Sequence, residues 1–146
     1  ILPDTVKVIG QSAFVRCSLN YIRMPRRLKE LGSYAFYSSA LKKITVYGKV
    51  ELGETFKYCK KLKTVVLKEG VKELGELVFH QCPKLRSVTV PKSVKRLVCI
   101  YDNIFYYRGL KCNLSKLTIK TPKNSEMYRY RKFWKKQYKI KVKVIK

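Results

Sequence analysis

The side chains that could perform catalysis are few and far apart in this sequence. His80 is the only histidine, and no second histidine and no pair of carboxylates lies beside it. Nucleophilic catalysis needs a base next to the nucleophile and a further group that orients the base. We therefore expect no catalytic residue and no enzyme, with His80 exposed or half exposed beside a turn.

The cysteines do not form a metal-binding motif. No C-x-x-C segment occurs, and thiolate metal sites need clustered ligands, so we expect no metal and no cofactor. One position of an internal repeat holds Cys17, Cys59, Cys82 and Cys112, with Ser39 in the second repeat. A packed core needs a small residue there, which favours a ladder of buried free thiols. A disulfide between stacked neighbours such as Cys59 and Cys82 is the alternative.

The charge of the chain is strongly positive. Lys and Arg number 34 against 9 Asp and Glu, a formal net charge of +25, while an apolar content of 46% supports a folded core. Such a surface attracts polyanions, among them nucleic acid, sulfated glycans, teichoic acids and anionic lipid headgroups. The alternative is a lysine bias that serves solubility, although such a bias usually raises the glutamate content as well.

A repeat of just over twenty residues organises most of the chain. Phe14, Phe36, Phe56 and Phe79 recur at steps of 22, 20 and 23 residues. A glycine precedes each Phe, and each repeat ends in an apolar trio of the form L-x-x-I-x-I. We expect five repeats, the last longer and with Val98 in place of glycine, followed by a C-terminal cap: 3–24, 25–46, 47–67, 68–90, 91–119 and 120–146.

Each part of the repeat predicts a local structure. The end of the trio alternates as in a half-buried strand, and Pro25 and Pro91 end such strands because proline cannot donate to the ladder. The glycine suits a positive φ or a close approach of two backbones. The stretch from glycine to cysteine predicts one helical turn that places Phe in the core. Stacked repeats then bury a column of apolar side chains that no single repeat can bury.

These residues carry a resemblance to a known family. The segments LPDTVKVIGQSAFVRCSLNYIRM (2–24) and GVKELGELVFHQCPKLRSVTVP (70–91) resemble the BspA-like leucine-rich repeat. The resemblance implies a leucine-rich repeat solenoid, a right-handed coil of strands and short helical turns with a parallel sheet on one face. It also implies a bacterial or protozoan surface protein that adheres to host proteins or other cells, and so an extracellular or cell-surface location. Val98, Ser39, the long fifth repeat and the basic charge depart from the family pattern.

The two ends of the chain differ in what they predict. The chain begins at Ile1 inside a repeat, so we expect a piece of a longer protein. Near the other end, Asn124 or Ser125 can cap a helix over 126–138, and residues 139–146 alternate as a strand with one lysine-rich face. This helix and strand suit a cap over the last repeat, with Trp134 covering it. The alternative is a basic amphipathic helix that binds a membrane or nucleic acid.

The outward positions of the predicted strands form the first candidate binding surface. Its residues are Tyr21, Arg23, Lys42, Lys43, Lys63, Arg86 and Lys116. We expect Lys42, Lys63 and Arg86 to form a column with a spacing of about 5 Å. Such a column either invites an anionic ligand or shields the sheet surface.

The insertion at 98–112 forms the second candidate surface. Tyr106, Tyr107 and Arg108 suit a protein contact or stacking on sugars or bases. The alternative is a surface bulge in which Ile104 and Phe105 replace the missing Phe of that repeat.

The leading functional hypothesis is a non-catalytic adhesion or interaction module that docks a protein or an acidic glycan on a basic face of the solenoid. The alternative is a nucleic-acid-binding module, supported by the charge and by 11 Tyr residues. No nucleic-acid-binding motif occurs in the sequence, and the positive charge is spread over the whole chain. No segment approaches the ~20 apolar residues of a membrane span, and the sequence carries no signal for an oligomeric state.

Overall fold

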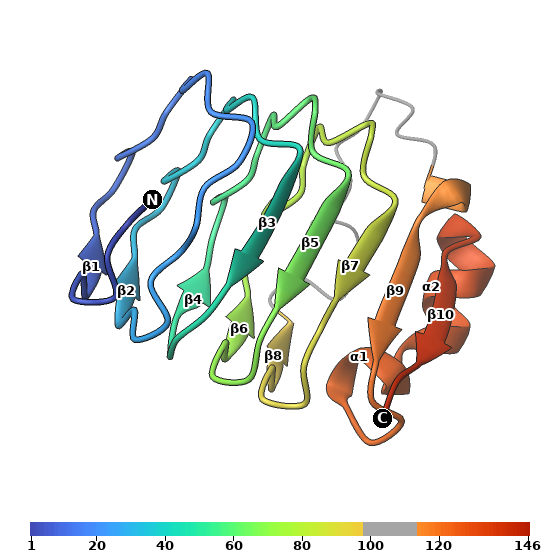
Figure 1. The fold of residues 1–146 in the computed structure, drawn as a ribbon. Coiled ribbons are helices and arrows are strands. Elements are labelled where there is room, and N and C mark those ends of the chain that lie inside the picture. Colours follow the sequence, from blue (N-terminus) through green and yellow to red (C-terminus); the bar gives the residue numbers. More distant parts are fainter. Residues whose placement is uncertain (98–113) are drawn as a thin grey trace.

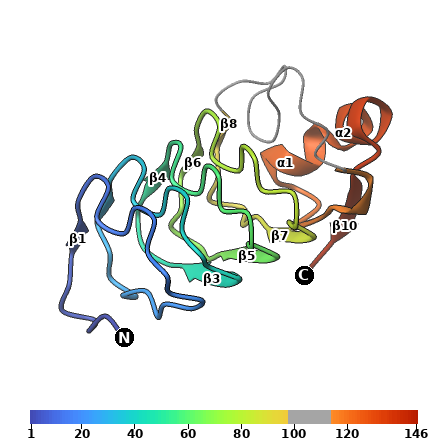
Figure 2. The ribbon, with the colours of Figure 1, turned by 90° about the horizontal axis from the view of Figure 1, so that it is seen from above.

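The chain winds into a stack of flat coils with parallel sheets on two sides (Figures 1 and 2). The structure, a computed structural model, describes residues 1–97 and 114–146. The main sheet has the order β10-β9-β7-β5-β3, formed by β3 (Lys43–Val46), β5 (Thr64–Leu67), β7 (Ser87–Thr89), β9 (Thr118–Thr121) and β10 (Lys141–Val144). All of its pairings are parallel. The expected leucine-rich repeat solenoid is confirmed.

A second side of the solenoid is also built from strands, which the sequence pattern did not predict. These strands are β1 (Val8–Ile9) and β2 (Glu30–Leu31) in one sheet, and β4 (Glu51–Leu52), β6 (Glu73–Leu74) and β8 (Arg96–Leu97) in another. We call this the short-strand side. It lies across the core from the main sheet (Figure 2). In β2 and β4 the Leu points into the core while the preceding Glu faces solvent. Because side chains of a strand alternate between its two faces, two residues are enough to bury one side chain per coil.

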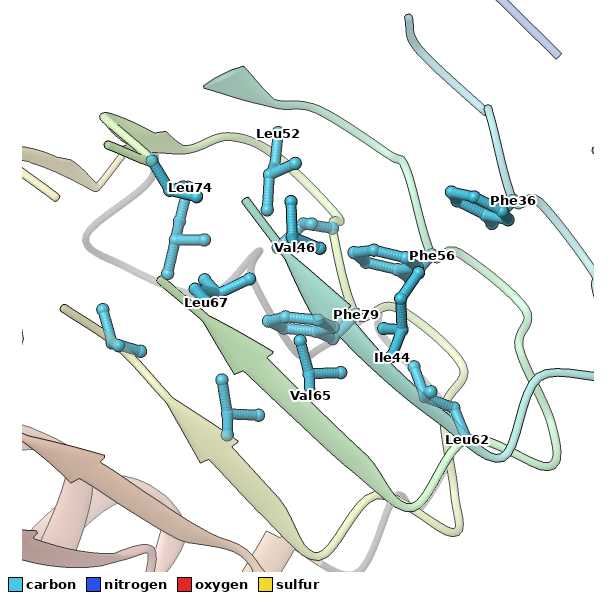
Figure 3. Close-up of a cluster of buried hydrophobic side chains, with 14 of the residues drawn as sticks. Phe36, Ile44, Val46, Leu52, Phe56, Leu62, Val65, Leu67, Leu74 and Phe79 are labelled. Atoms are coloured by element: carbon cyan, nitrogen blue, oxygen red, sulfur yellow. The ribbon is translucent and has the colours of Figure 1, made fainter. Parts of the chain in front are cut away.

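The core is a column of phenylalanine rings with aliphatic side chains around it (Figure 3). Phe14, Phe36, Phe56 and Phe79 lie with successive ring centroids 5.2, 5.8 and 5.9 Å apart and interplanar angles of 7°, 12° and 7°. The last three rings are fully buried, whereas Phe14 is half buried in the first coil. The repeat therefore places equivalent rings in direct contact, as its spacing predicted.

The segments that carry these rings are successive β-turns rather than the expected helical turns. In the second coil Tyr34 and Ser38 both adopt positive φ, of 59° and 55°, and the equivalent pairs in the other coils do the same. A left-handed residue at every fourth position interrupts a right-handed helix. It also turns the N–H of Phe36 toward the next coil, where it donates to the carbonyl of Thr55 at 3.0 Å.

The repeated cysteines form buried thiols. The Sγ of Cys59 donates to the carbonyl of Phe36 at 3.0 Å, and the Sγ of Cys82 to the carbonyl of Phe56 at 3.1 Å. Cys17, Cys59 and Cys82 are all free in the structure, although Cys17 is only half buried. These positions follow the thiol ladder that the sequence favoured; Cys99 and Cys112 lie outside the described residues.

The last strand of the repeat region pairs with a different register from the one the sequence suggested. The apolar pattern placed Leu117 level with Val88, but Val88 pairs with Ile119. A shift of two residues keeps the same side chains facing inward, because the side-chain period of a strand is two. The shift brings the polar Thr121 into the core, where its hydroxyl lies 2.6 Å from that of Ser125.

The C-terminal segment forms a cap of two helices and a strand. The predicted helix is divided into α1 (Glu126–Arg129) and α2 (Arg131–Tyr138), and Ser125 caps α1 by accepting from the N–H of Tyr128 at 3.1 Å. Met127 and Trp134 are buried in the core, which fits the predicted covering role. The chain then returns as β10, which pairs with β9 along its whole length. No helix within residues 1–97 or 114–146 is long and apolar enough to cross a membrane.

Two of the four repeated glycines allow close contact between coils. A Cβ at Gly75 would lie 2.7 Å from a backbone oxygen of the preceding coil, and one at Gly32 would collide with backbone in the same way. A Cβ at Gly53 would meet nothing within 4 Å. Among the glycines that the structure describes, positive φ values occur at two others, Gly48 and Gly70, in the turns after β3 and β5.

Replacing a ring in the middle of the column should destabilise the protein strongly. We expect Phe56→Ala to cost about 3–5 kcal/mol in the free energy of unfolding, because the cavity lies between two other rings. Phe14→Ala is the matched control and should cost clearly less, since Phe14 is half buried and has one ring neighbour. Urea unfolding followed by circular dichroism measures both, and equal losses would contradict the stacked column.

The glycines give a second matched pair. We expect Gly75→Ala to lower the free energy of unfolding by about 1–3 kcal/mol, because the new methyl group overpacks against backbone. Gly53→Ala should stay within about 0.5 kcal/mol of the wild type. Thermal and urea unfolding of the two variants would show the difference, and an equally destabilised Gly53→Ala would argue against the close approach.

Candidate binding surfaces

The predicted basic column lies at the start of the main-sheet strands. Lys42, Lys63 and Arg86 each precede a strand and are exposed. The N–H of Lys63 donates to the carbonyl of Lys42 at 2.8 Å, and that of Arg86 to Lys63 at 2.9 Å. The three residues are thus direct neighbours on successive coils. In the described part of the chain none of them forms an ion pair, although the Arg86 guanidinium donates to the carbonyls of Pro83 and Leu85.

The first coil extends this surface with two exposed side chains. Tyr21 pairs with Lys43 through an isolated parallel bridge, so it lies beside β3. Arg23 lies near the carboxylate of Asp4, at 3.7 Å. Both members of that ion pair are about half exposed, so it contributes little to stability. Arg23 is therefore partly neutralised, unlike the column of Lys42, Lys63 and Arg86.

Lys116 does not lie on the face where the sequence placed it. It belongs to the short 3-10 turn Leu114–Lys116 before β9, because β9 pairs two residues further along than the repeat pattern indicated. The outward row through Lys43, Thr64 and Ser87 continues instead to Thr118 and Lys141.

Three cations of the sheet face were missed by the sequence analysis. Lys120 pairs with Thr89 on one side and with Lys143 on the other, and Lys141 lies beside Thr118. All three lysines are exposed. The alternation in residues 139–146 carried the signal, but only the pairing of β10 with β9 shows that it extends the main sheet.

The main sheet lacks acidic residues, whereas the short-strand side carries both acidic and basic ones, with Arg96 of β8 ion-paired to Glu73 of β6 at 3.1 Å. The strands of the main sheet contain no Asp or Glu, and the structure describes all of their residues. Glu30, Glu51 and Glu73 lie on the short-strand side, in β2, β4 and β6. The main sheet therefore presents small hydroxyl side chains between cations, without carboxylates that would neutralise them.

Tyr106, Tyr107 and Arg108 lie in residues 98–113, outside the described part of the chain.

The turn side of the solenoid holds a cluster of ionisable groups around Glu54. The hydroxyl of Tyr34 and the ammonium of Lys57 both donate to the Glu54 carboxylate, each at 2.5 Å. Burial alone would raise the pKa of Glu54, but the hydrogen bonds from Lys57 and Tyr34 outweigh it and hold that pKa below its ordinary value. The carboxylate thus serves to join two coils.

His80 lies in the same cluster and is buried, so the expected exposed position is wrong. The residue is only 3% exposed. Its ring makes an edge contact with the ring of Tyr58, with the two ring centroids 5.4 Å apart. Tyr58, from the preceding coil, packs against it, and the sequence alone does not reveal this contact. Burial lowers the pKa of His80, and the nearby Lys57 lowers it further while Glu54 opposes the shift.

The cluster shows no arrangement typical of a catalytic or metal site. Within the described residues no group of three His, Cys, Asp or Glu side chains could hold a metal ion. Cys82 lies two residues from His80, but its thiol donates to backbone carbonyls. The polar groups of this side connect neighbouring coils, and they leave the basic main sheet as the stronger candidate for binding.

The burial of His80 predicts a pH-dependent stability. The pKa of the unfolded histidine is about 6.5 and the folded one is lower, so the folded state takes up the proton less readily. The free energy of unfolding should be highest above about pH 6.5 and should decrease as the pH drops toward 5. His80→Gln should lack this dependence, since the chain has no other histidine. Urea unfolding at pH 7, 6 and 5 tests this; parallel declines in both proteins would contradict it.

Comparisons with known proteins agree with this architecture. The family described as BspA type leucine-rich repeat region, with 6 copies, matches residues 1–111. A crystal structure of a leucine-rich repeat protein from Bacteroides ovatus is similar, with a TM-score of 0.60 and 27% identity over 86% of this chain. The chain spans 34% of that protein's length. No curated protein matches the sequence.

The family match indicates the general role of such chains. Leucine-rich repeat proteins of this type mediate protein interactions, are typically associated with the cell surface and are generally not enzymes. The match covers the Phe column and the main-sheet strands β3, β5 and β7. This chain belongs to the BspA-type leucine-rich repeat family.

Proposed function

We propose that this chain is a non-catalytic adhesion module that docks an acidic partner, a protein or an acidic glycan, on the basic main sheet. The single observation that carries the proposal is the column of Lys42, Lys63 and Arg86 on successive coils. Adjacent strands lie about 4.8 Å apart, so like charges in such a row repel one another. An anionic partner relieves that repulsion.

The composition of the sheet face supports a carboxylate- or sulfate-bearing partner. The middle of the face carries the half-exposed hydroxyls of Thr64, Ser87 and Thr89, which can donate hydrogen bonds. Lys43 lies beside Thr64 and Lys120 lies beside Thr89, whereas the carboxylates Glu30, Glu51 and Glu73 lie across the core. A field of one sign over one face raises the rate of encounter with a partner of opposite charge.

Nucleic acid is the weaker candidate. Proteins that hold single strands stack the bases on aromatic side chains along the groove. The residues of β3, β5, β7, β9 and β10 include no aromatic side chain, and the structure describes all of them. Tyr21 is the exposed ring beside β3. An extracellular or cell-surface location follows from the proposed adhesion role and from the family.

Charge reversal in the column should abolish docking. We expect Lys42→Glu/Lys63→Glu/Arg86→Glu to lose binding of an acidic probe, a 20-residue poly-glutamate peptide, in titration calorimetry at low salt. The matched control Lys60→Glu/Lys61→Glu/Lys84→Glu changes the net charge equally, at exposed turn residues outside the main sheet. The melting temperature should stay nearly unchanged in both, since exposed substitutions shift stability by about 0.5 kcal/mol or less each.

The outcome separates the docking face from a general charge effect. Equal weakening in both triple variants would mean that only net charge matters and would overturn the proposed face. A duplex DNA of 20 base pairs serves as the competitor. Tighter binding of DNA than of poly-glutamate at equal salt, lost in the column variant, would support the nucleic-acid alternative instead.

A further inference from the structure

Residues of α2, its C-cap and β10 line a basic groove. Both elements lie at the C-terminal end of the solenoid (Figure 1). Its volume is about 590 Å³, within the range of about 300–1,000 Å³ that is common for ligand pockets. Five cations line it, together with Ile140 and Val142: Arg131, Lys132, Lys135, Lys139 and Lys141. The groove is separate from the column of Lys42, Lys63 and Arg86, which lies before β3, β5 and β7.

The charge of the groove has no acidic counterpart nearby in the chain. Glu126 is the last acidic residue of the sequence. Its carboxylate forms an ion pair with Arg129 on α1, at 2.8 Å. Among the described residues, the groove cations therefore form no ion pair.

The spacing of three of these cations makes the helix itself less stable. Arg131, Lys135 and Lys139 follow one another at intervals of four, so they lie on one face of α2 and its C-cap. Like charges at this spacing repel one another along the helix. A bound anion that contacts all three would remove this repulsion.

One of the cations is held in place before any ligand arrives. The Arg131 guanidinium lies over the ring of Tyr128, 4.3 Å from its centroid, and one of its nitrogens donates to the Tyr128 carbonyl at 3.2 Å. These contacts with Tyr128 of α1 use one N–H and one face of the guanidinium. The other N–H donors stay available to an oxyanion. The four lysines around it are flexible and can follow the spacing of several anionic groups.

We propose that this groove binds the sulfate groups of a linear sulfated glycan. Five closely spaced cations match a ligand with several anionic groups per few sugar units. The lining contains no aromatic side chain on which a nucleic-acid base could stack. Its concave shape suits a narrow chain rather than a broad protein surface, and the half-buried Val142 offers an apolar contact to a sugar ring. The groove adds a second site to the adhesion module; it shares Lys141 with the sheet face but does not involve Lys42, Lys63 or Arg86.

The test compares two triple variants of equal net charge. Binding of a heparin-derived decasaccharide is measured by titration calorimetry at about 0.15 M salt. We expect Arg131→Gln/Lys135→Gln/Lys139→Gln to weaken binding at least tenfold, roughly 1.4 kcal/mol. The control Lys60→Gln/Lys61→Gln/Lys84→Gln should bind like the wild type. Equal losses in the two variants would overturn the proposed groove.

A second measurement uses the unmodified protein, so it holds even if the groove variant folds poorly. In ¹⁵N–¹H spectra recorded during the titration, amide shifts should concentrate in residues 131–142. Shifts confined to β3, β5 and β7 would overturn the groove site. Displacement of the decasaccharide by duplex DNA at equal charge concentration would overturn the glycan assignment. Lys42→Glu/Lys63→Glu/Arg86→Glu should keep its glycan shifts in 131–142, which distinguishes this site from the docking face.

Discussion

Direct stacking of one coil on the next is the constraint from which the rest of this structure follows. A coil of some twenty residues cannot enclose its own apolar side chains, so each coil completes the core of its neighbour. The parallel rings of Phe36, Phe56 and Phe79 show how closely equivalent residues must meet. Gly32 and Gly75 follow from the same need, because a methyl group there would hold the coils apart.

The same stacking organises the surface. Residues that are equivalent in the repeat become neighbours across coils, whether they point inward or outward. Inside, this creates favourable ring contacts; outside, it aligns Lys42 with Lys63 and gathers Glu51 beside Glu73 on the opposite side. When the same position of successive repeats holds the same type of charged residue, those residues form a row of like charge on the surface.

Much of the fold could be predicted from the sequence because the repeat records which residues become neighbours. The Phe column, the main sheet and the thiols at Cys59 and Cys82 were all visible in that pattern. The short-strand side was not, since two residues are too few for periodicity to show. The register of β9 and the groove beside Lys139 depend on how the chain departs from the repeat, and the burial of His80 depends on a contact with Tyr58 of the preceding coil. Those contacts join residues that no regular spacing relates.

The thiols in the core have a consequence for where this protein can exist. The Sγ atoms of Cys59 and Cys82 are enclosed and committed to carbonyl groups of the previous coil, and burial raises the pKa of Cys59. Oxidants react with the thiolate, which is therefore scarce and inaccessible at Cys59. This part of the core keeps the same covalent structure in a reducing cytoplasm and in an oxidising exterior.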